Sequence, residues 1–310
     1  MNLDWGRFWW IIGDEFARMW WIFVLGVAVA AVIKTFKWDK KIRKRLVGRT
    51  HGAILFAVGV GLVSPLCSCG IVPVVVSLIY GGVPLAPVFA LLITSPLMSP
   101  DAFLLTLGGL GPTLAFGKLA SATFAGLAGG YAVLGMQRRG WIREEGLLSA
   151  QRPDIKEKCM EGAAPDDPRR GLDVPRRRLW YFGLMVKDMS WIVGRFLVPA
   201  ILVEAALVAF VPLSWMRALA GGSGPASVLW AALAGIPVPL PQVAAVPVLR
   251  GLTELGMNQG AAMALLVSGP VTSIPALALL SAIFQRPVLG LYLVLGLLTA
   301  LGAGLVLLAV

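Results

Sequence analysis

Apolar residues run in long blocks along this 310-residue chain, and charged residues are confined to stretches between them. A helix needs about 20 mostly apolar residues to cross the hydrocarbon of a bilayer. Six blocks are long enough to predict a membrane helix: 16–35, 84–108, 112–135, 191–211, 258–283 and 287–309. Four shorter blocks form two pairs around proline-rich breaks, 52–65 with 70–81 and 225–239 with 242–255. The pattern leaves open whether these short segments cross the membrane or re-enter it.

The two halves of the chain repeat the same prolines and glycines at one constant spacing, without gaps. In an apolar chain such matches carry more weight than coincidences of Ala or Leu. The matching pairs are Gly61 and Gly235, Pro65 and Pro239, Pro73 and Pro247, Gly82 and Gly256, Pro96 and Pro270, and Ser99 and Ser273. This alignment, the repeat register, predicts a duplicated unit of about five segments.

The charge of the chain orients these two units. The net charge is +11, of which residues 34–49 hold +7 and residues 137–190 hold +3. Basic loops of polytopic membrane proteins lie on the cytoplasmic side. An odd number of segments per unit then inverts the second unit relative to the first, an arrangement common in secondary transporters.

The predicted fold class is an all-α polytopic membrane protein with two inverted-topology repeats and proline-broken, re-entrant-like helix hairpins. The repeats span 1–136 and 191–310, and a charged cytoplasmic linker, 137–190, joins them. This linker is expected to be a solvated connector, with a regulatory or partner-docking role as the alternative. The expected location is the cell (inner) membrane.

Composition excludes several classes of protein. The chain is 58% hydrophobic and 14% charged, whereas a soluble domain is about 25% charged. A soluble enzyme or a nucleic-acid-binding protein is therefore not expected. The sequence contains no phosphate-binding loop for ATP, and no cofactor is expected. The N-terminus lacks the features of a cleaved signal peptide, so we interpret residues 16–33 as a retained membrane helix.

The first break carries the clearest candidate chemistry. Cys67 and Cys69 lie two residues apart between Pro65 and Pro73, where prolines make a continuous helix improbable. Irregular backbone at membrane depth is tolerated where it is buried in protein or lines a watery cavity. Thiolates bind soft, thiophilic ions, so the two cysteines are candidate ligands for a soft metal or metalloid. The alternative is that they are small buried packing residues.

The second break keeps the prolines but has Pro241 and Val243 in place of the two cysteines. A soft-ligand site would therefore be one-sided. Gln242, opposite Ser68, offers an amide for substrate binding, or is a satisfied interfacial amide. The long helices that follow are each interrupted by prolines and small hydroxyl residues, which makes Ser95, Ser99, Thr272 and Ser273 candidate substrate-binding residues at broken helix ends. The alternative for these is a packed kink, with hydroxyls bonded back to carbonyls.

Ionisable residues within apolar runs are the remaining candidates. Glu204 and Asp101 are predicted to couple transport to protons, because intramembrane carboxylates often serve proton pathways. The alternative for Glu204 is a structural ion pair. Arg250 and Glu254, four residues apart, are predicted to pair with each other. Lys118 is expected to extend toward a membrane interface.

The run Pro65-Leu-Cys-Ser-Cys-Gly-Ile-Val-Pro-Val, followed by Ser95-Pro-Leu-Met-Ser-Pro, resembles the predicted bacterial permeases of the ArsP type. The resemblance covers residues 15–310. It implies an inner-membrane efflux permease, and the best-known members export trivalent organoarsenicals. The resemblance also implies a substrate-binding role for Cys67 and Cys69. The implied partners are a small-molecule or soft-metalloid substrate and the lipid bilayer, with no nucleic acid; homo-oligomerisation stays open.

Three hypotheses follow. The first is a secondary permease that exports a thiophilic solute held by the two cysteines. The second is a permease for another small solute or ion, with structural cysteines and binding at the helix ends. The third is a membrane thiol-redox or scaffold subunit, which the strained Cys-x-Cys spacing disfavours.

Overall fold

The computed structural model describes residues 50–64, 66, 71–72, 74–75, 78–79, 83–140, 224–236, 242–254, 256–281, 284 and 286–309. Within these ranges the chain is mostly helical and contains no strand. The predicted segments 16–35 and 191–211, and all but the first residues of the linker 137–190, lie outside the described residues. The all-α class is confirmed for the part described.

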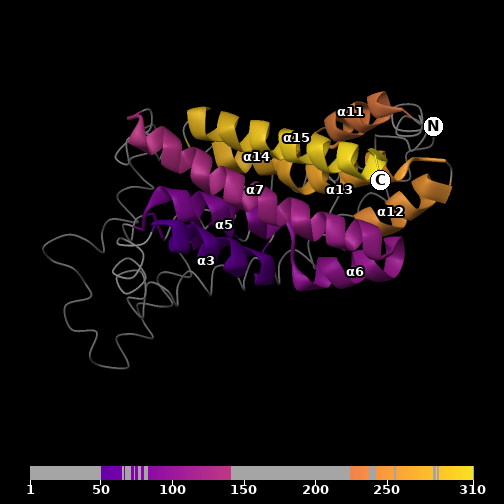
Figure 1. Cartoon of the computed structure of the whole chain (residues 1–310), viewed down its shortest axis with the longest axis horizontal. Coiled ribbons are helices and arrows are strands. Elements are labelled where there is room, and N and C mark those ends of the chain that lie inside the picture. Colours follow the sequence, from indigo (N-terminus) through magenta and orange to yellow (C-terminus); the bar gives the residue numbers. More distant parts are fainter. Residues whose placement is uncertain are drawn as a thin grey trace, which may run out of the picture.

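The first half contributes four described helices, drawn in indigo to magenta in Figure 1. They are α3 (Thr50–Val63), α5 (Leu85–Leu97), α6 (Pro100–Leu110) and α7 (Pro112–Arg138). The predicted segment 84–108 is thus two helices, because residues 98–99 are extended. Gly111, at a φ of 94°, makes the turn between α6 and α7, a backbone conformation that glycine adopts without steric cost.

The second half contributes five described helices, drawn in orange to yellow (Figure 1). They are α11 (Pro225–Ala234), α12 (Gln242–Glu254), α13 (Gln259–Thr272), α14 (Ile274–Ser281) and α15 (Arg286–Ala309). The predicted segment 258–283 is also divided, at Ser273. Both helix interruptions therefore fall where the sequence places them.

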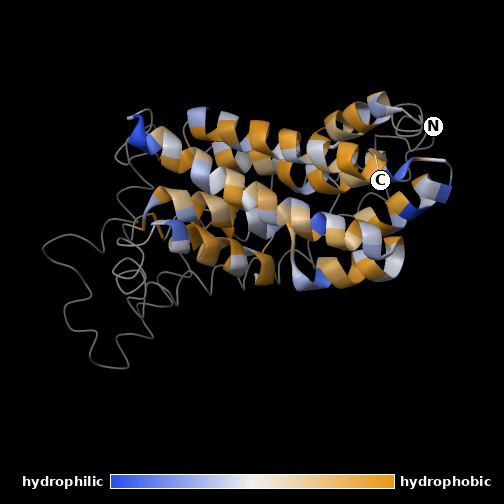
Figure 2. Cartoon of the chain, viewed as in Figure 1, coloured by the Kyte–Doolittle hydropathy of each residue, from blue (hydrophilic) through white to orange (hydrophobic). Residues whose placement is uncertain are grey.

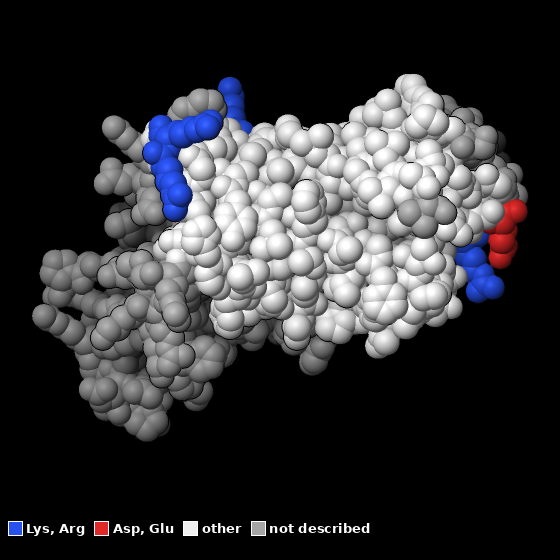
Figure 3. All heavy atoms as spheres, in the orientation of Figure 1, with Lys and Arg blue, Asp and Glu red and all other residues white. Residues whose placement is uncertain are grey.

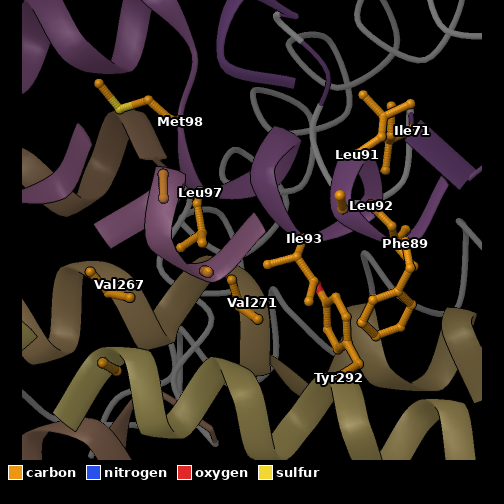
Figure 4. Packing of buried hydrophobic residues seen from close by; sticks show 14 of the residues in the cluster. Ile71, Phe89, Leu91, Leu92, Ile93, Leu97, Met98, Val267, Val271 and Tyr292 are labelled. Atoms are coloured by element: carbon orange, nitrogen blue, oxygen red, sulfur yellow. The ribbon is translucent and has the colours of Figure 1, made fainter. Parts of the chain in front are cut away.

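The two proline-containing helices α5 and α13 lie inside the bundle. All of α5 and almost all of α13 are buried, which explains why both are apolar around their whole circumference. Residues of both halves join in one apolar core, shown in Figure 4. There the ring of Tyr292 from α15 packs edge-to-face against Phe89 of α5, with centroids 6.3 Å apart.

The long helices α7 and α15 run antiparallel along the length of the molecule (Figure 1). A Cβ atom at Gly117, near the start of α7, would lie 3.1 Å from the side chain of Leu307, near the end of α15. Small residues allow such close approach of helices, as they do in membrane proteins generally.

Glycine contacts recur in the two halves at positions that the repeat register pairs. A Cβ atom at Gly130 of α7 would meet Ile54, Ala90 and the carbonyl of Ala86. A Cβ atom at Gly304 of α15 would meet the counterparts of all three, which are Val228, Ala264 and the carbonyl of Gly260. The same register thus describes both the sequence and the packing of the long helices.

This close packing gives a first prediction. Gly304→Ala should destabilise the protein, because the added Cβ would lie 2.7 Å from the carbonyl oxygen of Gly260 and 2.5 Å from Val228. Overpacking of this kind costs about 1–3 kcal/mol. Gly302→Ala, two residues away, is the matched control because nothing lies within 4 Å of its Cβ position. Melting of the detergent-purified variants measures the difference, and equal melting temperatures would contradict the described contact between α13 and α15.

Large apolar side chains are exposed on the outer helices. In Figure 2 hydrophobic residues recur along the helices. The exposed set includes Phe56 on α3, Leu104 on α6, Phe124 on α7, Trp230 on α11 and Leu298 on α15. Among the described residues, three helical stretches are long and apolar enough to cross a membrane: Leu85–Leu110, Pro112–Arg138 and Arg286–Ala309. These observations fit a protein surrounded by lipid.

Candidate functional site

The break between α5 and α6 is the best-described part of the candidate site. Pro96 lies in the last turn of α5, Met98 and Ser99 are extended, and Pro100 is the first residue of α6. The amide of Phe103 donates to the carbonyl of Ser99 at 2.9 Å and starts the new helix. A proline lacks the amide that would continue a helix, so two prolines four residues apart account for the interruption.

The break between α13 and α14 has the same construction. Pro270 lies in the last turn of α13, and Ser273 has the extended ψ of 140°. The amide of Leu277 donates to the carbonyl of Ser273 at 3.0 Å, which is the counterpart of the bond between Phe103 and Ser99. Each break exposes helix ends whose partial charges can hold a polar or charged group.

Helices α5 and α13 contact each other inside the bundle. Leu97, at the end of α5, and Val267 and Val271 of α13 belong to the same apolar core (Figure 4). Met98 is 2% exposed and belongs to the same core. Its thioether is therefore placed as a packing group in this conformation.

The hydroxyl residues predicted at the breaks are all buried. They differ in whether the hydroxyl bonds to its own helix or to a distant part of the chain. Thr272 donates to the carbonyl of Ser268 at 2.8 Å, so its hydroxyl satisfies its own helix. Ser95 instead donates across 29 residues to the carbonyl of Leu66 at 2.9 Å. Because Leu66 directly precedes Cys67 in the sequence, this bond ties the first proline-rich break to the end of α5. Ser99 and Ser273 lie at the first residue before α6 and α14.

Thr94 and Ser268 are counterparts that were not among the predicted site residues. The Thr94 hydroxyl donates to the carbonyl of Ala90 at 2.8 Å. The Ser268 hydroxyl is buried and has no hydrogen-bond partner among the described residues. A buried hydroxyl without a partner is costly, and this one lies two residues before Pro270 in the second broken helix.

Two glycines bring the shorter helices against the breaks. A Cβ atom at Gly61 of α3 would lie 2.9 Å from Cβ of Thr94 and 3.4 Å from the amide of Ser95. A Cβ atom at Gly235, after α11, would overlap the hydroxyl of Ser268 and lie 3.0 Å from the amide of Gly269. The repeat register pairs these contacts as well.

The structure does not describe the side chains of the other predicted substrate-binding residues or of Glu204. Cys67, Ser68, Cys69 and Glu204 lie outside the described residues. Gln242 is the first residue of α12, and its side chain is not described. In the described ranges no group of three His, Cys, Asp or Glu residues is placed to hold a metal ion.

The ionisable residues differ in their surroundings. Asp101 is exposed, in the first turn of α6. Arg250 and Glu254 form the predicted pair, with a nitrogen-to-oxygen distance of 3.4 Å and both side chains exposed. The exposed ring of His51 packs in a tilted arrangement against the ring of Tyr131 of α7, with ring centroids 5.5 Å apart.

The expectation that the side chain of Lys118 reaches a membrane interface is wrong. It is 1% exposed, and its ammonium nitrogen has no hydrogen-bond partner in the part of the chain that the structure describes. The carboxylate of Asp101 is close enough to interact with it electrostatically. Lys118 is among the buried residues of α7, so its side chain does not extend to the surface.

Most of the exposed charges among the described residues lie at the two ends of the molecule. Figure 3 shows basic residues at the end where α7 finishes, and a basic and an acidic residue together at the opposite end. Arg138 and Arg139 lie at the end of α7. Arg286 begins the antiparallel α15, and Arg250 and Glu254 supply the opposite pair. On the face that Figure 3 shows, the surface between the two ends is nearly free of charge among the residues described.

A helical bundle with exposed apolar side chains and two interrupted inner helices is typical of membrane transporters. The comparison with known families agrees: residues 5–309 match the family ArsP_1, described as predicted permeases. The chain belongs to this family of membrane permeases, as the sequence motifs predict.

Curated relatives support the same class. The chain is 25% identical to the UPF0718 protein YcgR of Bacillus subtilis over 266 residues, which cover 85% of this chain and 84% of YcgR. It is 32% identical to the UPF0718 protein MJ0584 of Methanocaldococcus jannaschii over 95 residues, 31% of this chain and 26% of that protein. A Streptococcus mutans protein named as a subunit of a two-component membrane permease complex is 30% identical over 93 residues, 30% of this chain and 31% of that protein. No solved structure matches the chain.

Proposed function

We propose that this chain is a secondary permease built from two inverted repeats, with its substrate site where the two proline-rich breaks meet the interrupted helices. The observation that carries the proposal is the recurrence of the same break in both halves, with the same glycine packed against it. Broken helices at the interface of two repeats are the usual place of substrate sites in secondary transporters.

The repeats are inverted in this proposal because their counterparts α7 and α15 run in opposite directions. The basic end of the molecule, with Arg138, Arg139 and Arg286, is the cytoplasmic end by the positive-inside rule. His51, which follows the net +7 stretch of residues 34–49, contacts Tyr131 in the last turns of α7. Both basic loops then lie on the cytoplasmic side of the cell membrane.

The substrate in this proposal is a small thiophilic solute such as a trivalent organoarsenical, and its export is coupled to an ion. Cys67 and Cys69 hold the soft atom, since thiolates prefer soft partners. The bond from Ser95 to the carbonyl of Leu66 supports this arrangement, because it fixes the residue before Cys67 against the break in α5. Glu204 and Asp101 take up and release protons.

A second candidate is a permease for another small solute, with the helix ends as the binding groups. Two observations favour it: the second half lacks the two thiols, and Ser268 presents a buried hydroxyl without a described partner. The two candidates share the fold and differ in the role of the cysteines.

Export of methylarsenite by bacterial cells separates the candidates. Cells that produce the wild-type chain should survive methylarsenite better than cells without it and accumulate less arsenic. Cys67→Ser/Cys69→Ser should lose this protection, because serine does not bind trivalent arsenic as a soft ligand. Cys159→Ser, in the linker, is the matched control and should protect like the wild type.

Equal protection by the double variant and the wild type would remove the thiols from substrate binding. Equal sensitivity with and without the wild-type chain, at a verified level of membrane protein, would remove this substrate class.

A further inference from the structure

Lys118 is a buried ammonium without a hydrogen-bond acceptor among the described residues. It lies one to two turns inside α7, and its side chain is covered by protein. No described residue accepts a hydrogen bond from its nitrogen. Ionised groups inside a membrane protein are costly unless they are paired, and they commonly mark the path of a substrate or ion.

The helices that pack against α7 offer this ammonium one negative charge among the residues described. These helices are α3, α5, α6, α13 and α15. Their described titratable residues are His51 of α3, Asp101 of α6, and Arg286 and Tyr292 of α15; α5 and α13 have none. Asp101 interacts with Lys118 electrostatically, but it is exposed, and no hydrogen bond joins the two groups.

The electrostatic interaction with Asp101 relates Lys118 to the break between α5 and α6. The carboxylate is in the first turn of α6, an 11-residue helix that begins at the interruption. The N-terminus of a helix carries partial positive charge and free amide groups, which favour an anion. The buried ammonium and the helix terminus are both positive, and Asp101, in the first turn of α6, interacts with the ammonium electrostatically.

The charges occur in the first half alone. In the repeat register, Asp101 corresponds to Pro275 and Lys118 to Tyr292. Tyr292 is buried, like Lys118, and its hydroxyl also has no partner among the described residues. The two counterpart positions thus both hold a buried polar side chain, and of the two only Lys118 can carry a charge that attracts an anion.

We propose that Lys118 binds an anionic oxygen group of a transported solute, a carboxylate or a small inorganic oxyanion, at the break between α5 and α6, and that Asp101 competes with the solute for the ammonium. The inference rests on the permease function proposed above. An incoming anion would accept a hydrogen bond from this ammonium, for which the described residues offer no acceptor. Asp101 attracts the same ammonium electrostatically when the solute is absent, which lowers the cost of burying the charge.

Thermal melting of the detergent-purified chain tests this site without a transport assay. Sodium acetate or sodium phosphate replaces sodium chloride at constant ionic strength. The wild type should show a saturable rise in melting temperature with one of these probes. Lys118→Met keeps the length and apolar stem of the side chain, and should weaken the apparent affinity by at least about tenfold. Asp101→Asn should tighten it by about threefold, because the competing carboxylate is lost.

The opposite effects of the two variants distinguish binding from a structural ion pair. If Lys118 and Asp101 only stabilise each other, both substitutions lower the melting temperature and neither alters the response to the probes. Because Asp101 is exposed, Asp101→Asn should fold normally. If Lys118→Met does not fold, the change in probe affinity of Asp101→Asn tests the proposal.

Three results would overturn the proposal: a wild type that responds to no probe, equal affinities in the wild type and Lys118→Met, or weaker binding by Asp101→Asn. Stabilisation by phosphatidylglycerol in mixed micelles, but by neither free anion, would also overturn it in favour of a lipid headgroup. Methylarsenite export by the same variants in cells reports separately on the proposed function.

Discussion

Leucine in place of Gly61 should abolish export and destabilise the protein by about 3 kcal/mol or more. Gly61 brings α3 directly against the break of α5: a Cβ atom there would lie 2.9 Å from Cβ of Thr94. Thr94 and Ser95 cannot retreat freely, because Ser95 is bonded to the carbonyl of Leu66 and Thr94 to that of Ala90. The added side chain must therefore push α3 away from the break and separate the groups that the bond from Ser95 holds together.

Gly59→Leu is the matched control, in the same helix and two residues away. Its Cβ position has no neighbour within 4 Å, and the residue is exposed. It should support methylarsenite export and melt like the wild type. Melting of purified protein and arsenic accumulation in cells measure the two effects. A Gly61→Leu variant that exports and melts normally would contradict the close packing of α3 on the broken helix.

Joining α5 and α6 into one helix should stop transport without unfolding the protein. In Pro96→Ala/Pro100→Ala both prolines at the break become alanine, the residue with the highest helix propensity. Removing a proline from a helix interior favours the helix by about 3 kcal/mol. The variant should therefore melt at or above the wild-type temperature. Its export should fall by at least about tenfold, because a continuous helix removes the two helix ends that meet at residues 98–99.

Pro112→Ala provides the control for this variant. Pro112 is the first residue of α7, a position where proline is well tolerated, and it lies outside the break. Its replacement should change neither export nor melting. Normal export by the double variant, with circular dichroism that reports added helix, would show that the interruption has no part in transport.

Most of the helical architecture could be predicted from the sequence, because membrane helices are read from apolar length and proline position. Segment 112–135 corresponds to α7 (Pro112–Arg138), and segment 287–309 to α15 (Arg286–Ala309). The two interruptions were also predictable, since prolines recur at both. The pairing of Arg250 with Glu254 follows from their spacing on one helix and is confirmed.

The site was less predictable, because it depends on which side chains face each other across the fold. Lys118 was expected at an interface, since lysine usually extends there. The glycine-rich α7 has no clear apolar stripe, so its sequence does not reveal that this position faces the bundle. The bond from Ser95 to Leu66 joins residues 29 apart, and no local pattern signals such a contact. From the sequence, Ser268 and Tyr292 look like ordinary packing residues; the structure shows that both hydroxyls are buried without a hydrogen-bond partner in the described part of the chain.

The opposite orientation of the two repeats is tested most directly by chemical labelling of two counterpart residues. Thr113, at the start of α7, and Pro287, at the start of α15, are exposed and are paired by the repeat register. Each becomes the single cysteine, as Thr113→Cys or Pro287→Cys, in a chain whose three cysteines are serine. A membrane-impermeant maleimide should label position 113 in intact spheroplasts and position 287 only after permeabilisation. Labelling of both positions from the same side of the membrane would contradict the inverted-repeat permease.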